Sequence, residues 1–201
     1  MNRNTTKKLL FACLLLMMVL TPLYIFRHRI AFLLRPPVTG TAIDSLNGVK
    51  VYYNGDIGNV KGRNISPDGY NIGLQFQCVE FVKRYYYEFY HHKMPDSYGH
   101  AVSFYDTTLQ DSSYNARRDL MQYSNPGYCM PKVGDLIVFA GNGGNPYGHV
   151  AIISKVKPDK IEIVQQNPGI GMPSRVTIPL SRNNDIWRIN SDRILGWLRM
   201  K

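Results

Sequence analysis

Cys78 and His149 of this 201-residue chain combine a residue type and a position that could supply a nucleophile and its base. Cys78 follows a turn-rich run over residues 68–73 and opens a stretch whose apolar residues recur at helical spacing. In the first turn of a helix, unpaired N–H groups and the positive end of the helix dipole favour a thiolate. The sequence therefore predicts a nucleophile at Cys78. The alternative is a buried cysteine that acts as a small hydrophobic residue.

A cysteine nucleophile needs a base within hydrogen-bond reach and a further polar group to orient that base. His149 stands where the Gly-rich loop over residues 140–148 enters an apolar stretch, at the predicted start of a strand. From such a position an imidazole can face a helix start. The other four of the five histidines lie outside a pattern of this kind. We therefore expect His149 to be the base.

The orienting group must come from the strand after the next turn, where Gln165, Gln166 and Asn167 cluster. If the hairpin is centred on Pro158, His149 lies opposite Asn167, and Gln165 and Asn167 share its face. A centre half a residue later favours Gln166 instead. Spacing alone leaves this register open.

The elements that must position these side chains follow from periodicity and turn signals. A helix is expected from Gln75 to about Tyr90. Strands are expected over residues 49–53, 133–139, 149–154 and 161–166, and further helical stretches around 98–109 and 115–121. This order predicts an α+β domain in which the cysteine helix packs on an antiparallel sheet.

The N-terminus has a different composition. Residues 9–26 carry no charge and as a helix would span roughly 27 Å, close to the thickness of a bilayer core. We expect a basic tail over 1–8, an uncleaved transmembrane anchor over 9–26, a juxtamembrane linker over 27–39 and the enzyme domain over 40–201. Cations flank both ends of the anchor, so its orientation is weakly specified. The expected location is a bacterial-type inner membrane with the domain facing the cell envelope, and a cytosolic face is the alternative.

The net charge of +10 is concentrated at the same end of the chain. Residues 1–43 hold six cations and no acid, which leaves 18 cations against 14 acids, or +4, in the remainder. This scattered excess excludes a nucleic-acid partner.

The three cysteines show neither a disulfide framework nor zinc spacing, and Cys129 is interpreted as incidental. We expect no metal and no cofactor, and oligomeric state is unknown.

Four motifs stand in order along the chain: Gln77-Cys78-Val79-Glu80-Phe81, Gly148-His149-Val150-Ala151-Ile152-Ile153, Gln166-Asn167 and Ile194-Leu195-Gly196-Trp197. With these motifs the sequence resembles the CHAP family of cysteine- and histidine-dependent amidohydrolases and peptidases, and in particular the amidase domain of bifunctional glutathionylspermidine synthetase/amidases. The resemblance covers about residues 40–200. It implies a papain-like α+β fold and hydrolysis of an amide through a cysteinyl thioester, with Cys78 as nucleophile and His149 as base.

Two positions depart from the pattern of these relatives. Gln165 stands where they carry a glutamate, and an amide can fix the imidazole tautomer but cannot supply a negative charge. Lys83 stands where they carry an arginine suited to a substrate carboxylate, and lysine lacks the bidentate fork. For the oxyanion, the backbone N–H of Cys78 and the side chain of Gln77 are candidate donors, and Asn167 is a further orienting candidate.

The leading hypothesis is a membrane-anchored cysteine hydrolase that cleaves an amide or peptide bond. A domain that faces the cell envelope would act on peptidoglycan peptides, and one that faces the cytosol would act on a glutathionylspermidine-like amide. The alternative is a catalytically inactive CHAP-fold binding module tethered to the membrane. The expected partners are thus a peptide or amide substrate and a membrane bound through the N-terminal helix.

Overall fold

The computed structural model describes residues 3–201, without the side chains of residues 3–6, 8 and 25–33. It divides into two units, residues 1–37 and 38–201. In the first unit, α1 runs from Arg3 to Leu34. None of the helices described is both long and apolar enough to cross a membrane.

That finding overturns the predicted transmembrane anchor over residues 9–26 and the predicted single-pass membrane location. A bilayer core requires about 20 consecutive apolar residues. The predicted anchor, residues 9–26, has 18 residues and includes Thr21 and Pro22, so it lies at the short end of the length that a bilayer core needs. The last two residues of the predicted anchor, 25 and 26, have side chains outside the described part of the chain, as do most of the predicted tail.

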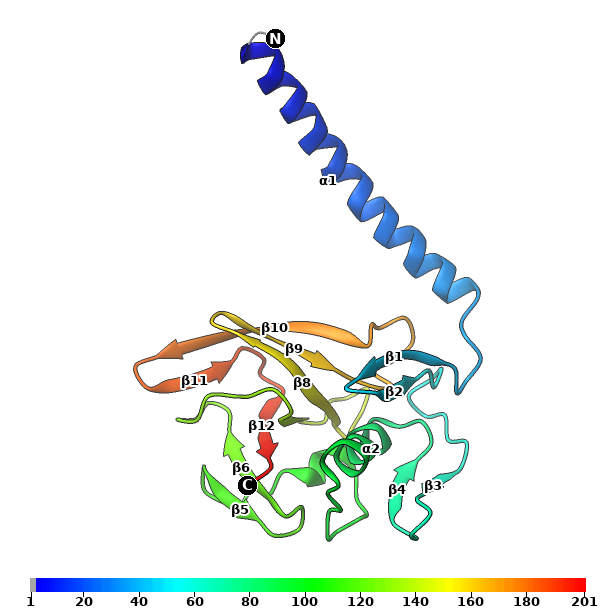
Figure 1. The fold of residues 1–201 in the computed structure, drawn as a ribbon, viewed down its shortest axis with the longest axis vertical. Helices are drawn as coiled ribbons and strands as arrows, with labels where there is room; N and C mark the ends of the chain where they lie inside the picture. The colour runs from blue at the N-terminus through cyan, green and yellow to red at the C-terminus, as the bar shows by residue number, and fades with distance from the viewer. Residues whose placement is uncertain (1–2) are drawn as a thin grey trace. The chain divides into compact units, whose positions relative to one another are not determined.

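The predicted α+β class is also wrong, because the regular secondary structure of residues 38–201 is mostly β-strand (Figure 1). Over the described residues the chain has two α-helices, α1 and α2 (Cys78–Tyr90), and one short 3-10 helix, η1 (Ala101–Phe104). The strands are β1 (Ala42–Leu46), β2 (Val49–Tyr52), β3 (Arg63–Ile65), β4 (Asn71–Leu74), β5 (Ser113–Asn115), β6 (Leu120–Ser124), β7 (Leu136–Phe139), β8 (His149–Lys157), β9 (Lys160–Val164), β10 (Arg175–Asn183), β11 (Ile186–Ile189) and β12 (Ile194–Arg199).

The main sheet has eight strands in the order β11-β10-β9-β8-β7-β12-β6-β5, and all the neighbouring strands pair antiparallel. The hairpins β1-β2 and β3-β4 form two further small sheets. In Figure 1 the long strands β8, β9 and β10 lie side by side, as their pairing requires. Helix α2 packs against β8, β4 and β2.

Two helical stretches expected from sequence do not form. The stretch around 98–109 contains only the four residues of η1. The stretch around 115–121 is the turn between β5 and β6, where Asp119 has a positive φ of 53°. The amide of Asn115 donates to Gln122 Oε1 at 2.9 Å across this hairpin. Pairing with the sheet thus overrides helix propensity in this stretch.

The central strands are buried on both faces. Along β7, Leu136 and Val138 belong to the core cluster shared with α2, whereas Ile137 and Phe139 belong to a second cluster on the opposite face. Alternate side chains of a strand point to opposite faces, so this pattern follows from pleating. A run without polar alternation is expected when both faces are covered.

An irregularity in β8 sets the register at the site. Near the turn, Lys157 pairs with Lys160, whereas closer to the strand start Ile152 pairs with Val164. The shift falls between Ile153 and Lys155, which makes Ser154 an extra residue in β8. The bulge therefore returns the His149 end of the hairpin to the register of a turn centred on Pro158.

Candidate active site

Cys78 is the first residue of α2, and Gln77 precedes it in an extended conformation as the N-cap. The thiol is almost fully buried, with 9% of the residue exposed. Burial raises the pKa of Cys78 to about 11, against hydrogen bonds from the backbone of Val150, Val79 and Cys78 itself. Val150 follows His149 in the chain, so its hydrogen bond to the thiol places the start of β8 beside Cys78.

His149 opens β8, and its Nε2 lies 2.9 Å from Gln165 Oε1. Gln165 Nε2 donates to Pro173 O at 3.0 Å, which fixes the amide with its oxygen toward the imidazole. An amide oxygen can only accept, so His149 Nε2 carries the proton and Nδ1 holds the free lone pair. Burial lowers the pKa of His149 to about 4, although the hydrogen bond with Gln165 opposes the shift.

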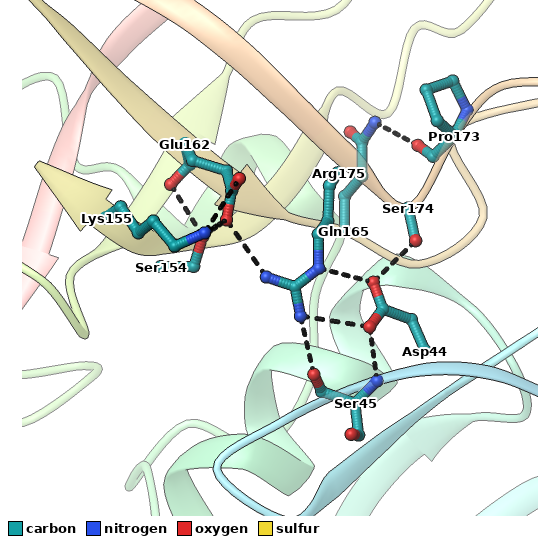
Figure 2. A network of polar contacts seen from close by, with 9 residues as sticks. All are labelled: Asp44, Ser45, Ser154, Lys155, Glu162, Gln165, Pro173, Ser174 and Arg175. Atoms are coloured by element: carbon teal, nitrogen blue, oxygen red, sulfur yellow. Dashed lines mark hydrogen bonds and ion pairs between the residues drawn. The ribbon is translucent and has the colours of Figure 1, made fainter.

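The segment that holds Gln165 is anchored by a polar network (Figure 2). The N–H of Gln165 donates to Ser174 O at 2.8 Å, and Ser174 Oγ donates to Asp44 Oδ2 at 2.7 Å. Arg175 Nε donates to Asp44 Oδ2 at 2.9 Å, and its Nη1 donates to Glu162 Oε1 at 3.0 Å. This network connects β1, β9 and β10 around the backbone that orients the Gln165 amide.

A second polar cluster lies beneath the cysteine. Arg84 Nε donates to Glu80 Oε1 at 2.6 Å within α2, and Gln166 Nε2 donates to Glu80 Oε2 at 2.8 Å. Gln166 Nε2 also donates to Gln77 O at 3.0 Å, immediately before the cysteine. Gln166 is therefore turned toward α2 and not toward His149, which answers the register question in favour of the face shared by Gln165 and Asn167.

Gln77 and Asn167 are brought together, but not onto the imidazole. Asn167 Nδ2 donates to Gln77 Oε1 at 2.8 Å, and Gln77 Nε2 donates to Ile57 O at 2.9 Å and Asn59 O at 2.8 Å. Both N–H groups of the Gln77 amide are thus occupied, so in this arrangement it offers no free donor to an oxyanion. Asn167 Oδ1 is buried without a hydrogen-bond partner among the described residues.

Lys83 lies away from the cavities. It is buried, and its Nζ donates to Asn71 O and, at 2.7 Å, to Ser97 O. Burial, together with the positive charges of Arg118 and Arg63, lowers its pKa to about 7. The ammonium is engaged by backbone carbonyls, and Lys83 does not line either cavity described below.

Two adjoining cavities meet at His149. One of about 460 Å³ contains Cys78 and His149, and the other of about 380 Å³ contains His149 and Gln165. Ile57, Asn145 and Asn167 also line both. The arginines Arg63 and Arg193, one in each cavity, were not singled out by sequence, since no spacing relates either of them to the cysteine or the histidine.

Within the described residues, no group of histidine, cysteine, aspartate and glutamate side chains could hold a metal ion.

Comparisons with known proteins cover parts of the chain. The model of the CHAP domain matches residues 66–167. Glutathionylspermidine synthase of Crithidia fasciculata is 22% identical over 142 residues, which are 65% of this chain and 19% of that protein. The chain thus spans about a fifth of that curated relative.

Two solved structures are also similar. Ly7917 with the hydrolyzing product of MDP is 24% identical, with 37% of this chain and 30% of that chain covered and a TM-score of 0.29. For Ly7917 by itself the identity is 19%, the coverage 49% and 41%, and the TM-score 0.31.

Proposed function

The chain belongs to the CHAP domain family, among the cysteine amidases and peptidases, and we propose that it hydrolyses an amide or peptide bond through a thioester on Cys78. The observation that carries the proposal is the hydrogen bond of 2.9 Å between His149 Nε2 and Gln165 Oε1, beside the cavity that His149 shares with Cys78. A nucleophile, a base and a group that orients the base are the components that this chemistry needs.

The first half of the reaction forms the thioester. His149 Nδ1 takes the proton of the Cys78 thiol as the sulfur attacks the substrate carbonyl carbon. The resulting oxyanion is stabilised by the backbone N–H of Cys78 and by the positive end of α2. The C–N bond then breaks, and the imidazolium returns the proton to the departing amine.

The second half regenerates the enzyme. His149 takes a proton from a water molecule, whose oxygen attacks the thioester carbonyl carbon. The C–S bond breaks, the carboxylic acid leaves and the proton returns to the Cys78 sulfur. The products are one amine and one acid for each water consumed, with the same base acting in both halves.

The protonation states of Cys78 and His149 in the free enzyme favour proton transfer during the attack over a preformed thiolate–imidazolium pair. Burial raises the pKa of Cys78 to about 11 and lowers that of His149 to about 4, so both groups are neutral near pH 7. The thiol must therefore lose its proton as the bond to carbon forms. Gln165 supports this step by holding the Nε2–H tautomer, which leaves Nδ1 free to accept.

Two substrate classes fit a C–N hydrolase of this family. One is a peptidoglycan peptide, and the other is a glutathionylspermidine-like amide, which agrees with the name of the curated relative. Both classes can be tested with the purified full chain, and the release of free amine measures their hydrolysis.

A thiol-directed activity probe provides the decisive experiment. We expect labelling of Cys78 to be lost in Cys78→Ala and strongly slowed in His149→Ala, and hydrolysis to be lost in both. Cys129→Ser is the matched control, since that thiol is half-buried and accepts a hydrogen bond from Arg199 at 3.2 Å, away from the cavities. If Cys78 is inert to the probe and no substrate is cleaved, the chain is a binding module and the proposal fails.

A further inference from the structure

The two cavities are alike in the charge of the residues that line them. Arg63 lines the cavity that contains Cys78, and Arg193 lines the cavity that contains Gln165. No aspartate or glutamate lines either cavity in the described part of the chain. A substrate that crosses His149 therefore meets a guanidinium on both sides and a carboxylate on neither.

Arg63 is available for a ligand. It is exposed on β3, where its Nη1 donates to Asn71 Oδ1 at 3.0 Å and its guanidinium carbon lies 5.5 Å from the centre of the Tyr98 ring. It forms no ion pair with the described acids. Most of its N–H donors thus remain free for a planar anion. Lys83, by contrast, has its ammonium bound to backbone carbonyls.

Arg193 is held in place but keeps its charge uncompensated. Its Nε and Nη2 donate to Ala140 O at 3.3 and 2.9 Å, so a neutral carbonyl fixes the guanidinium. No ion pair to a described carboxylate is found for it. Burial is the main cause of the lowered pKa of His149, and the positive charge of Arg193 lowers it further. The second cavity therefore also favours an anion.

We propose that the enzyme selects substrates with a carboxylate on each side of the scissile bond, one bound by Arg63 and the other by Arg193, and disfavours polyamine conjugates. This inference rests on the proposed function and narrows it. In either orientation, the polyamine half of a glutathionylspermidine-like amide would place an ammonium against an arginine with no acid to pair with it. Like charges brought together in a partly desolvated groove are a source of specificity. Acidic peptides, as in peptidoglycan stems, avoid this repulsion.

Matched substrates test the proposal. Synthetic peptidoglycan stem peptides are prepared with each carboxylate free or converted singly to a carboxamide, and kcat/KM is measured for the full chain. Each amidation should lower kcat/KM about 10- to 100-fold, as expected for loss of a hydrogen bond to a charged group. Arg63→Gln should cause a similar loss on the free acid, with little further loss on the peptide whose Arg63-side carboxylate is amidated. Arg63→Lys should restore part of the loss.

Arg193→Gln should show the same selectivity for the other carboxylate. Arg182→Gln is the matched control, because Arg182 pairs with Asp185 at 2.7 Å and lines neither cavity. Equal losses of kcat/KM on free and amidated peptides would overturn the proposal, because they would show that the arginines do not distinguish a carboxylate from a carboxamide. Glutathionylspermidine cleaved as fast as the acidic peptide would overturn it as well.

Binding separates this proposal from the proposed function. Cys78→Ala retains the cavities but cannot turn over, and calorimetry gives its Kd for each peptide. A reactive Cys78 in the wild type, together with equal Kd values for free and amidated peptides, would refute only the charge selection. An inert Cys78 with no turnover would refute the hydrolase, and a 10- to 100-fold preference in Kd for the free acid would still support the two arginine subsites.

Discussion

Two polar clusters hold the two sides of the candidate active site, and they differ in burial. The cluster of Glu80, Arg84 and Gln166 lies beneath Cys78, and the side chains of Glu80 and Arg84 are only 1% and 6% exposed. The cluster of Asp44, Arg175 and Glu162 lies behind Gln165. Its Arg175 side chain is 36% exposed. The nucleophile is thus fixed from inside the protein and the orienting group from near its surface.

This difference separates what each cluster contributes. Removing one partner of a buried ion pair leaves an uncompensated charge without water, whereas an exposed pair contributes little to stability. The buried cluster also binds the carbonyl of Gln77 through Gln166, so it joins the start of α2 to the end of β9. We infer that folding depends on the first cluster and that the second mainly adjusts the geometry of Gln165.

The largest expected effect follows from breaking the buried cluster. Glu80→Ala leaves the Arg84 guanidinium buried without its partner and should lower the free energy of unfolding by about 3–5 kcal/mol. Chemical denaturation of the full chain gives this value. Glu162→Ala is the control in the exposed cluster and should cost about 1 kcal/mol or less. Equal losses in the two variants would show that burial does not distinguish the clusters.

Gln165→Ala tests the link from the exposed cluster to the chemistry. Without the amide oxygen, the His149 imidazole can rotate and take the other tautomer, so kcat should fall on the order of ten- to a thousandfold with little change in stability. Gln165→Glu should be tolerated and should raise kcat if charge on the imidazolium limits the rate. Steady-state kinetics on one peptide substrate measure both variants.

Asn167→Ala is the matched control for Gln165→Ala. Asn167 shares the same region but its amide donates to Gln77 Oε1 and not to the imidazole. A large loss in kcat for this variant, with none for Gln165→Ala, would transfer the orienting role to Asn167.

The orienting residue also shows how far sequence could reach. Alternation could place Gln165 and Asn167 on one face of a strand, but the choice against Gln166 depended on a register that a bulge at Ser154 determines. The turn pairs Lys157 with Lys160, which by itself would have favoured Gln166. A bulge leaves no clear compositional signal, because its extra residue is accommodated by the backbone.

The cysteine helix and the strands β7, β8 and β9 were predictable, since each has a continuous apolar pattern between turn signals. The remaining strands were not predicted beyond β2, and the class was therefore wrong. For example, β3 has three residues, of which two are exposed, so periodicity has little to detect. The same limit applies to Arg63 within that strand, which reaches the cavity only through tertiary packing.

The dependence of kcat/KM on pH tests the base His149 and its orienting group Gln165 together. Because burial lowers the pKa of His149 to about 4, the neutral base persists above that pH, and kcat/KM should fall only as pH drops through about 4. In Gln165→Glu the added carboxylate stabilises the imidazolium, so this acid limb should move to higher pH. Profiles of kcat/KM against pH for both proteins measure the shift. An acid limb of the wild type near the ordinary histidine value would show that His149 is solvated in the working enzyme.

The smallest expected effect belongs to Arg175, and it decides whether the exposed cluster acts through Gln165. Arg175→Ala removes the donor to Asp44 and Glu162 and should cost about 1 kcal/mol or less of stability. The loosened segment should let the Gln165 amide turn, so kcat should fall by about two- to tenfold, with Arg182→Ala as the silent control. In a Gln165→Ala background the same change should have no further effect, because residues that act through one another are not additive. An equal loss of kcat in both backgrounds would instead mean that Arg175 supports the cavity by a route independent of the orienting amide.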